Sequence, residues 1–207
     1  MARRTKEEAL ATRELLLDTA ETIFLQRGVA QTSLNDIACA AGLTRGAVYW
    51  HFEDKAALYN ALMDRLSTTC ATLVQGAQQQ HPHDAVAALR SLANAPVRLI
   101  LDNAHALRLF TIAMHRVEFS EDLAAIWARH VSKGSEYIAL IEEALRAVEA
   151  QGHALRLPVA SAALGLFTLV DGLLTYITLD PARIDRLQEA GPVIDAFLAG
   201  LGCPPPG

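Results

Sequence analysis

Residues 32–55 read TSLNDIACAAGLTRGAVYWHFEDK, and this stretch decides the fold. Ser33 with Asp36 forms a capping box that starts a helix, and Gly42 ends that helix after about two turns. Thr44 caps a second short helix, which ends near Phe52. Two short helices joined by a tight turn predict a helix-turn-helix.

The second of these helices has a buried side and an exposed side. On a helical wheel, Val48 and Phe52 mark the buried side. An arginine can bind guanine, aromatic rings can contact thymine methyl groups, and a glycine lets the backbone approach a duplex closely. Those residue types favour contact with base edges, although the two aromatic rings could instead pack on a neighbouring helix. The exposed side consists of Arg45, Gly46, Tyr49 and Trp50.

Lys55 lies in the first turn of the next helix, which Asp54 caps. A cation at this position opposes the helix dipole unless an anion lies nearby. A DNA phosphate could bind both the ammonium group and the free backbone N–H groups of the helix start. The alternative is an ordinary solvated surface lysine.

The rest of the chain has the apolar period of helices throughout. Thr5 and Glu8 form a capping box for a first helix that Gly28 ends. We expect an all-α fold with a three-helix helix-turn-helix domain at residues 1–54, a larger helical domain at residues 55–203 and a disordered tail at residues 204–207. The later helices are expected at residues 55–78, 84–101, 104–116, 121–150, 158–179 and 192–201, with breaks at 78–82, Gly152, Pro158, Pro181 and Gly191–Pro192.

The composition indicates a folded protein with a large core. Of the 207 residues, 52% are hydrophobic and 20% are charged, which excludes disorder for most of the chain. Three cysteines without a C-x-x-C pair exclude a disulfide scaffold and a zinc ribbon. The net charge of −5 gives no sign of nucleic-acid binding, but residues 37–52 contain Arg45 and His51 and no acidic residue.

Residues 157–179 are apolar enough to require a comparison with a membrane span. Asp171 lies near their middle, where an acid costs about 3 kcal/mol, and several hydroxyl residues dilute the apolarity further. A buried core helix is therefore favoured over a membrane segment. Residues 1–8 carry positive charge without an apolar run behind them, so we expect no secretory signal and a cytoplasmic protein.

Two motifs resemble a known family. They read TSLxxIAxxAG at residues 32–42 and TRGAVYWHFxxK at residues 44–55. They closely resemble the DNA-binding domain of TetR-family transcriptional repressors, and the resemblance covers about residues 5–62. The opening residues 1–8 and the YWHF order at residues 49–52 are similar to the branch of local repressors of multidrug efflux pumps. Weaker matches follow at residues 115–119 and 170–173.

The resemblance implies a DNA-binding role for eight residues. Arg45 and Gly46 would lie at base edges. This chain departs from the pattern at Glu53, which places an acid beside the phosphate-binding residues, and at Cys39, which we expect to be exposed near DNA. A redox switch at Cys39 and an inert thiol both remain open. The residues implied to bind mostly phosphates are Ser33, Thr44, Tyr49, Trp50, His51 and Lys55.

The larger helical domain has many apolar positions and few catalytic ones, which suits a bundle with a ligand cavity. The resemblance implies a pocket between the fourth and eighth helices for apolar or amphipathic small molecules. Alternatively, these side chains form a simple core, and His115 and Glu118 satisfy each other. The expected lining is Leu66, Leu89, Leu92, Phe110, Met114, His115, Phe167, Val170 and Leu174.

The helices at residues 158–179 and 192–201 offer more apolar surface than one bundle can hide. We expect them to form a four-helix interface in a homodimer, as the resemblance also implies. Gly165 and Gly172, seven residues apart, lie nearly on one face and would permit close approach. The interface residues expected are Gly165, Gly172, Leu173, Ile177, Val193 and Phe197.

We therefore expect a repressor that binds double-stranded operator DNA and is released by a ligand, with no enzymatic activity, cofactor or metal. His81 and His83 have a metal-ligand spacing but no evident third ligand. One alternative is a bundle that binds another protein through its exposed aromatic residues. The other is a helical enzyme, which lacks a nucleophile with an adjacent base and would have to use His115 with Glu118 or His105 with Asp102.

Overall fold

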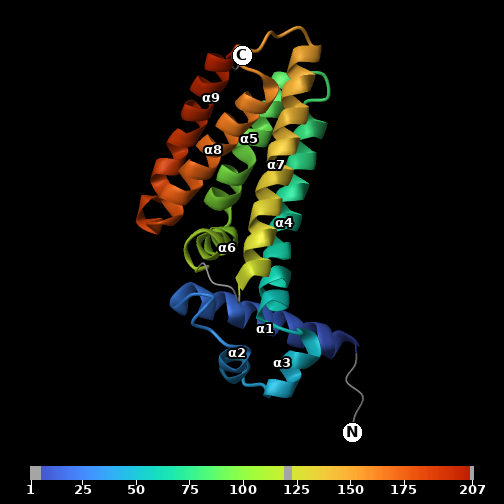
Figure 1. Cartoon of the computed structure of the whole chain (residues 1–207), viewed down its shortest axis with the longest axis vertical. Coiled ribbons are helices and arrows are strands. Elements are labelled where there is room, and N and C mark those ends of the chain that lie inside the picture. The colour runs from blue at the N-terminus through green and yellow to red at the C-terminus, as the bar shows by residue number, and fades with distance from the viewer. Residues whose placement is uncertain (1–5, 119–122, 206–207) are drawn as a thin grey trace.

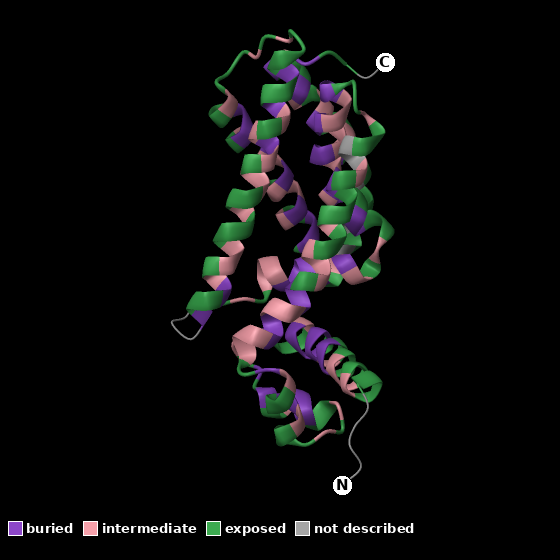
Figure 2. Cartoon of the chain, turned by 90° about the vertical axis from the view of Figure 1, so that its right-hand side faces the viewer, coloured by how far each residue is buried: buried purple, intermediate pink, exposed green. Residues whose placement is uncertain are grey.

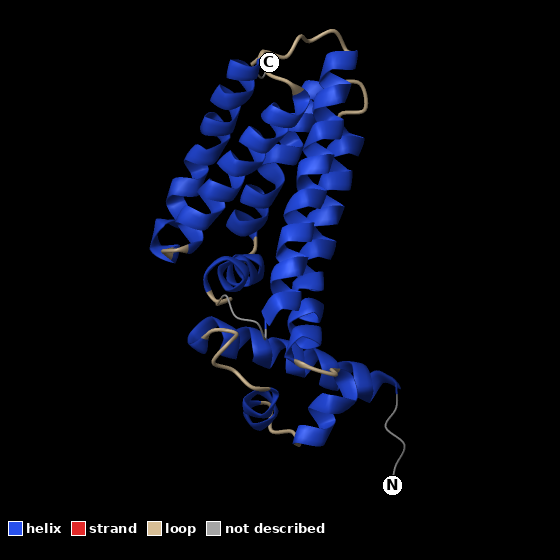
Figure 3. Ribbon diagram, in the orientation of Figure 1, coloured by secondary structure: helices blue, strands red, loops and turns tan. Residues whose placement is uncertain are grey.

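The computed structural model describes residues 6–118 and 123–205, except for the side chains at positions 77, 78, 181, 183, 184 and 187. Within these ranges the chain forms helices joined by turns and contains no β-strand (Figure 3). The all-α prediction is therefore confirmed. The elements are α1 (Lys6–Arg27), α2 (Leu34–Ala40), α3 (Arg45–His51), α4 (Lys55–Gln80), α5 (Ala85–Asp102), α6 (Ala104–His115), α7 (Ala124–Ala150), α8 (Val159–Thr178), the 3-10 helix η2 (Pro181–Glu189) and α9 (Ala190–Leu201).

Side-chain caps set most of the helix starts that the sequence predicts. The side chains of Ser33, Thr44 and Asp54 accept hydrogen bonds from backbone N–H groups in the first turns of α2, α3 and α4. Gly28 and Gly42 have positive φ angles of 85° and 67°, which end α1 and α2. The predicted cap Thr5 and the start predicted at residue 121 lie outside the described residues.

The helices form an upright bundle standing on a smaller domain (Figure 1). α4 and α7 are the long helices of the bundle, and α5, α8 and α9 lie beside them. α1 runs across the lower end of the bundle, with α2 and α3 beneath it. α6 is seen nearly end-on at that lower end and contacts α1, α4, α5 and α8. It therefore links the two parts of the molecule.

Two hydrophobic cores correspond to these two parts (Figure 2). The upper core contains side chains from α4 to α9, whereas the lower core contains α1, α2 and α3. Leu58 and Leu62 of α4, with Leu109 and Ile112 of α6, are also fully buried in the lower core. The first turns of α4 thus pack with the N-terminal helices, although we placed the domain boundary before residue 55.

The end of the chain differs from the expectation in two places. Pro192 does not interrupt α9. It lies in the first turn of this helix, where backbone N–H groups have no partner within the helix. The carbonyl oxygen of Pro204, placed in the predicted disordered tail, accepts a hydrogen bond of 3.0 Å from Arg90, and the preceding Cys203 is buried. Residues 206 and 207 lie outside the described part.

Among the described residues, α8 is the one helix with the length and apolar composition of a membrane span. It packs against α5, α6, α7 and α9, and Leu166, Val170 and Leu174 are buried in the upper core. This packing agrees with the expectation of a core helix.

Candidate nucleic-acid interface

The helix-turn-helix is built from local interactions. Ser33 and Asp36 form the predicted capping box, and the hydroxyl of Ser33 donates a hydrogen bond of 2.6 Å to the Asp36 carboxylate. This hydrogen bond, together with one from the Ser33 backbone N–H, lowers the pKa of Asp36. Ile37 and Ala38 then bury the inner face of α2 in the lower core. These contacts orient α3, which follows Gly42 and Leu43.

The exposed side of α3 is the predicted one. Val48 and Phe52 are buried, whereas Tyr49 is 46% exposed and Trp50 is 70% exposed. The two aromatic rings therefore do not pack into the protein, and that alternative is excluded for the free chain. Large apolar rings on a solvent face indicate a binding surface.

Arg45 is held above Tyr49, one turn further along α3. Its guanidinium carbon lies 5.2 Å from the centroid of the Tyr49 ring, and its Nη2 donates a hydrogen bond of 3.4 Å to the Tyr49 hydroxyl. The cation–π contact restricts the flexible arginine side chain before any ligand binds. Trp50 contacts the ring of His51 edge-on, with 4.5 Å between ring centroids. The helix thus presents a partly ordered set of polar and aromatic groups.

Gly46 leaves the backbone of α3 open. A Cβ atom built at this position would meet only the Thr44 hydroxyl oxygen, at 4.0 Å, among the atoms of the chain itself. The glycine is therefore not required by packing within the protein. The lack of a side chain would let another molecule approach the backbone closely, and the position of Gly46 at base edges stays a prediction.

Lys55 is placed differently from the expectation. Its Nζ donates hydrogen bonds of 2.8 Å to the Val29 carbonyl oxygen and 3.1 Å to the Ala30 carbonyl oxygen, and the residue is half-buried. Both the phosphate role and the solvated-lysine alternative assumed an ammonium group facing outward. The solvated-lysine alternative is wrong. The phosphate role stays a prediction.

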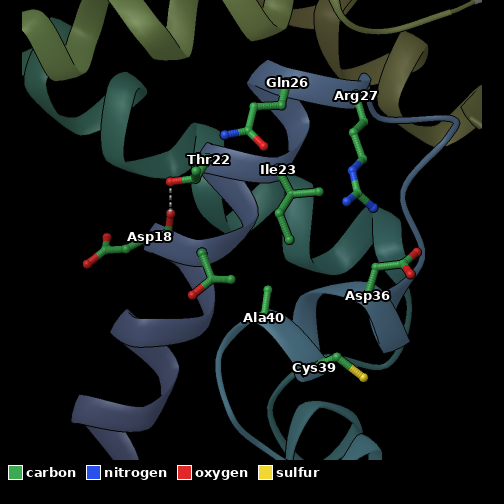
Figure 4. Close-up of a pocket in the computed structure, with 9 residues that line it drawn as sticks. Asp18, Thr22, Ile23, Gln26, Arg27, Asp36, Cys39 and Ala40 are labelled. Carbon is green, nitrogen blue, oxygen red and sulfur yellow. Dashed lines mark hydrogen bonds between the residues drawn. The ribbon is translucent and has the colours of Figure 1, made fainter.

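Two open hollows flank the helix-turn-helix. One, of about 780 Å³, lies between α1 and α2, and Figure 4 shows Arg27 on α1 pointing toward Asp36 on α2, with Gln26 and Cys39 also in its lining. The other, of about 450 Å³, lies beside α3 and is lined in part by Ser33, Tyr49, Glu53 and Lys55. Cys39 is exposed, as predicted. Sequence analysis did not anticipate the first hollow, since its two sides come from different helices.

The residues expected to line a ligand pocket come together in the upper core. All nine lie on α4, α5, α6 or α8, and Tyr137 of α7 adds a hydrogen bond of 2.8 Å to the Leu92 carbonyl oxygen. The side chains are packed against one another, so the structure is equally that of an apolar core. Leu89, Leu92, Phe110, Val170 and Leu174 are buried, whereas Leu66, Met114 and Phe167 are partly buried against them.

His115 has partners that its sequence neighbours do not reveal. Its Nε2 lies 3.1 Å from the Thr175 carbonyl oxygen and 2.9 Å from the Thr178 hydroxyl oxygen, both on α8. A carbonyl oxygen can only accept, so this geometry fits a proton on Nε2. One alternative paired His115 with Glu118, whereas the printed partners of His115 Nε2 both lie on α8. The imidazole instead fastens the end of α6 to α8.

A buried carboxylate that sequence analysis missed joins the two parts of the molecule. Glu21 of α1 is 4% exposed, and its oxygens lie 2.6 Å from Arg108 Nε and 2.8 Å from His105 Nδ1, both on α6. Glu21 is more than eighty residues away from His105 and Arg108 in the sequence, so no local sequence pattern predicts these contacts. The enzyme alternative required His105 to pair with Asp102. In the structure His105 pairs with Glu21 instead.

The outer faces of α8 and α9 are uncharged and exposed. On α8, Leu164, Thr168, Gly172 and Tyr176 follow one another at four-residue intervals on the exposed side. On α9, the exposed residues include Val193, and also Pro192, Ala196, Ala199 and Gly200. We call this surface the α8–α9 face. Gly172 and Val193 of the expected interface lie on it.

The other residues of the expected interface make contacts within their own chain. Ile177 is 1% exposed in the upper core, so it offers no surface to a second copy. A Cβ atom at Gly165 would lie 2.9 Å from the Phe197 ring, so this glycine permits packing of α9 on α8 within one chain. Leu173 is half-buried against the core. The interface prediction is corrected at Ile177, whereas Gly165, Leu173 and Phe197 are partly exposed and their place in an interface stays a prediction.

The described residues hold no group of three or more His, Cys, Asp and Glu side chains placed for a metal ion.

A helix-turn-helix with an exposed recognition helix, attached to a large helical bundle, defines a two-domain DNA-binding regulator. The charged contacts between α1 and α6 make the two parts one connected body.

Comparison with known proteins agrees with this class. The model of the family described as bacterial regulatory proteins, tetR family, matches residues 16–62. The probable HTH-type transcriptional regulator ArpR of Pseudomonas putida is 36% identical over 99% of this chain and 98% of its own length. The chain therefore belongs to the TetR family of bacterial regulatory proteins, which are DNA-binding transcriptional regulators and not enzymes.

Two solved structures are similar over most of their length. NalD, the secondary repressor of the MexAB-OprM multidrug efflux pump in Pseudomonas aeruginosa, has a TM-score of 0.84 and 32% identity, with 95% of this chain and 98% of that chain covered. The SmeT–triclosan complex has a TM-score of 0.75 and 28% identity, with 92% and 91% covered. The predicted family and its efflux-repressor branch are thereby confirmed.

Proposed function

We propose that this protein is a homodimeric repressor of a multidrug efflux operon, released from its operator by apolar or amphipathic small molecules. The observation that carries the proposal is the exposed side of α3. On this side Arg45 lies over the Tyr49 ring, and the Trp50 side chain is largely exposed to solvent. NalD represses an efflux pump, and SmeT binds triclosan. Both similarities support the same function for this chain.

In the proposed complex, α3 enters the major groove. Arg45 and Gly46 contact base edges, because a guanidinium can bind guanine O6 and N7 and a glycine lets the backbone come close. Around them, Ser33, Thr44, Tyr49, Trp50 and His51 bind phosphates, which position the helix without specifying sequence.

A second copy is required for useful affinity. Helix-turn-helix proteins bind palindromic sites whose half-sites are one helical turn, or a multiple of it, apart. We propose that the α8–α9 face provides the contact between copies. Its exposed residues are uncharged, and Gly172 has no atom within 4 Å of a built Cβ, so a helix of the second copy can approach closely.

The ligand is proposed to enter the upper core. Val170 and Leu174 of α8 lie with Leu89 and Leu92 of α5 in the upper core, and His115 contacts α8 beside them. Binding there would shift α6 or α4, both of which also contact the lower core. By reciprocity, a ligand that weakens DNA binding a hundredfold requires about 2.7 kcal/mol of coupling, and DNA weakens ligand binding by the same factor.

Selection of bound fragments from random duplex DNA tests this function. We expect one palindromic sequence family to be enriched and to bind far more tightly than random DNA. A panel of apolar compounds that includes triclosan should contain members that release the selected DNA. Enrichment of no sequence would reject the DNA-binding proposal, and equal ligand affinity with and without saturating DNA would reject the coupling.

Overpacking the upper core separates the two activities. Val170→Trp should reduce the response to ligand while leaving DNA binding intact, because Val170 is 2% exposed within the bundle and lies away from α3. Val131→Trp is the matched control, since Val131 is 65% exposed on α7. An unchanged ligand response in Val170→Trp would place the ligand elsewhere.

A further inference from the structure

We propose that Arg90 of α5 is a positioning residue for assembly, because its ion pair with Asp195 decides which side of α9 faces outward. The helix α9 forms part of the α8–α9 face, which the proposed function assigns to the contact between two copies. The inference rests on that proposed function for its assembly readout. The contacts that carry it lie within one chain.

The sequence of α9 does not by itself decide which side of this helix is buried. Its residues read AGPVIDAFLAGL, and Asp195 is the one charged or hydrogen-bonding side chain among them. A helix that is apolar on every side has no polar face to keep in water, so hydrophobicity alone permits several rotations about its axis. The burial of Ile194 and Leu198, with Val193 left exposed, therefore needs a further determinant.

Arg90 pairs with this single charged side chain of α9. Its Nε donates a hydrogen bond of 2.6 Å to Asp195 Oδ1, and its Nη2 donates one of 3.0 Å to the Pro204 carbonyl oxygen just beyond α9. The side chains of Arg90 and Asp195 are 17% and 31% exposed, so the pair is half-buried. Because a guanidinium holds its donors in a fixed plane, the two acceptors constrain both the rotation of α9 and the position of its end.

The next turn of α5 contacts the same side of α9. Asn94 Nδ2 donates a hydrogen bond of 2.9 Å to the Arg90 carbonyl oxygen, and a Cβ atom built at Gly191 would lie 3.8 Å from Asn94 Oδ1. Gly191 and Asp195 are four residues apart and therefore share one side of α9. With that side held on α5, Val193 lies nearly opposite and is exposed on the α8–α9 face.

An ion pair of this kind contributes more to the choice of arrangement than to stability. The attraction between two half-buried charges is offset by the cost of removing them from water, so an apolar pair in their place often leaves stability unchanged or raises it. A single polar contact within an apolar interface instead disfavours every arrangement that leaves it unpaired. The pair of Arg90 and Asp195 thus selects one rotation of α9.

Arg90→Met with Asp195→Leu tests the proposal, because this double variant removes the pair and fills both positions with apolar groups. Sedimentation without DNA should give a dimer dissociation constant about tenfold larger, since only chains with α9 in the native rotation can associate. Association itself adds stability, so the stability of the chain is compared by urea unfolding in a Leu164→Glu background that keeps the copies apart. There the unfolding midpoint should be unchanged or raised.

The matched control is Arg146→Met with Glu142→Leu, which removes an ion pair of the same 2.6 Å length within α7 and should change neither quantity. An unchanged dissociation constant in the variant that lacks Arg90 and Asp195 would overturn the proposal. A lower unfolding midpoint in the Leu164→Glu background would also overturn it, because the pair would then be an ordinary stabilising contact.

Two single substitutions decide the question if the double variant does not fold. Arg90→Lys keeps a cation beside Asp195 and should keep the dissociation constant close to that of the wild type. Arg90→Gln removes the charge and should raise the constant about tenfold. Equal constants for the two variants would refute the positioning role.

Cys203 reports on the end of α9 independently of association. It is 3% exposed directly after α9, and Arg90 binds the carbonyl oxygen of the next residue. In a Cys39→Ser background, Arg90→Gln should raise the rate of Cys203 modification by iodoacetamide about tenfold, because the end of α9 opens more often. Mass spectrometry of the Cys203 peptide measures this rate, and an unchanged rate would refute the positioning role. If the wild type were a monomer or bound no DNA, the proposed function would fail, while this rate would still judge Arg90.

Discussion

Arg45 is the side chain on which we expect base discrimination by α3 to depend. Its guanidinium is already stacked on Tyr49, so a base-edge contact costs little further ordering. Arg45→Ala should lower the ratio of selected to random DNA affinity by about 1–3 kcal/mol. Competition binding at fixed salt measures the ratio. An unchanged ratio would remove Arg45 from the base readers.

The three thiols differ in burial, and this difference predicts their reactivity. Burial raises the pKa of Cys70 to about 11 and also raises the pKa of Cys203, whereas Cys39 is exposed. A raised pKa leaves less of the reactive thiolate at pH 8, so iodoacetamide should modify Cys39 first. The rate at Cys70 should rise with pH up to about 11. In Cys39→Ser, fast modification should disappear, and modification of Cys70 as fast as Cys39 would contradict this ranking.

At the level of elements, the α1–α6 contact depends on Glu21. Arg108→Ala leaves a buried carboxylate with His105 as its remaining α6 partner and should destabilise the fold by about 1–3 kcal/mol. Glu21→Gln with Arg108→Ala should cost less than the sum of the two single changes, because the pair is removed together. Urea unfolding measures each variant.

Arg146→Ala provides the comparison, since Arg146 makes an exposed pair with Glu142 within α7 and should change stability by less than about 1 kcal/mol. Equal losses in Arg108→Ala and Arg146→Ala would show that the α1–α6 pair has no special role in holding the two parts together.

For the whole molecule, the α8–α9 face predicts the state of assembly. Leu164 lies on this face and is 56% exposed. Leu164→Glu would bury a charge in the proposed four-helix contact, at a cost of several kcal/mol. We expect a monomer by light scattering and loss of binding to the palindromic site. Val131→Glu, at an exposed position on α7, should remain dimeric. A Leu164→Glu protein as dimeric as this control would place the interface elsewhere.

Local sequence determined the helix-turn-helix. The caps at Ser33 and Thr44, the positive φ at Gly42 and the buried side formed by Val48 and Phe52 all depend on residues within about four positions of one another. Such relations repeat wherever the local sequence recurs. For this reason the exposed side of α3 and the family were both predictable.

Only the tertiary structure decided which distant groups meet. Lys55 bonds to carbonyls 25 and 26 residues away, and Glu21 meets Arg108 on another helix, because the crossing of α1, α4 and α6 brings them together. The side of α8 that faces the core could not be predicted either. Apolar residues surround the whole helix, so no periodic pattern separates Ile177 from Gly172. Packing against α5, α7 and α9 buries one and leaves the other exposed.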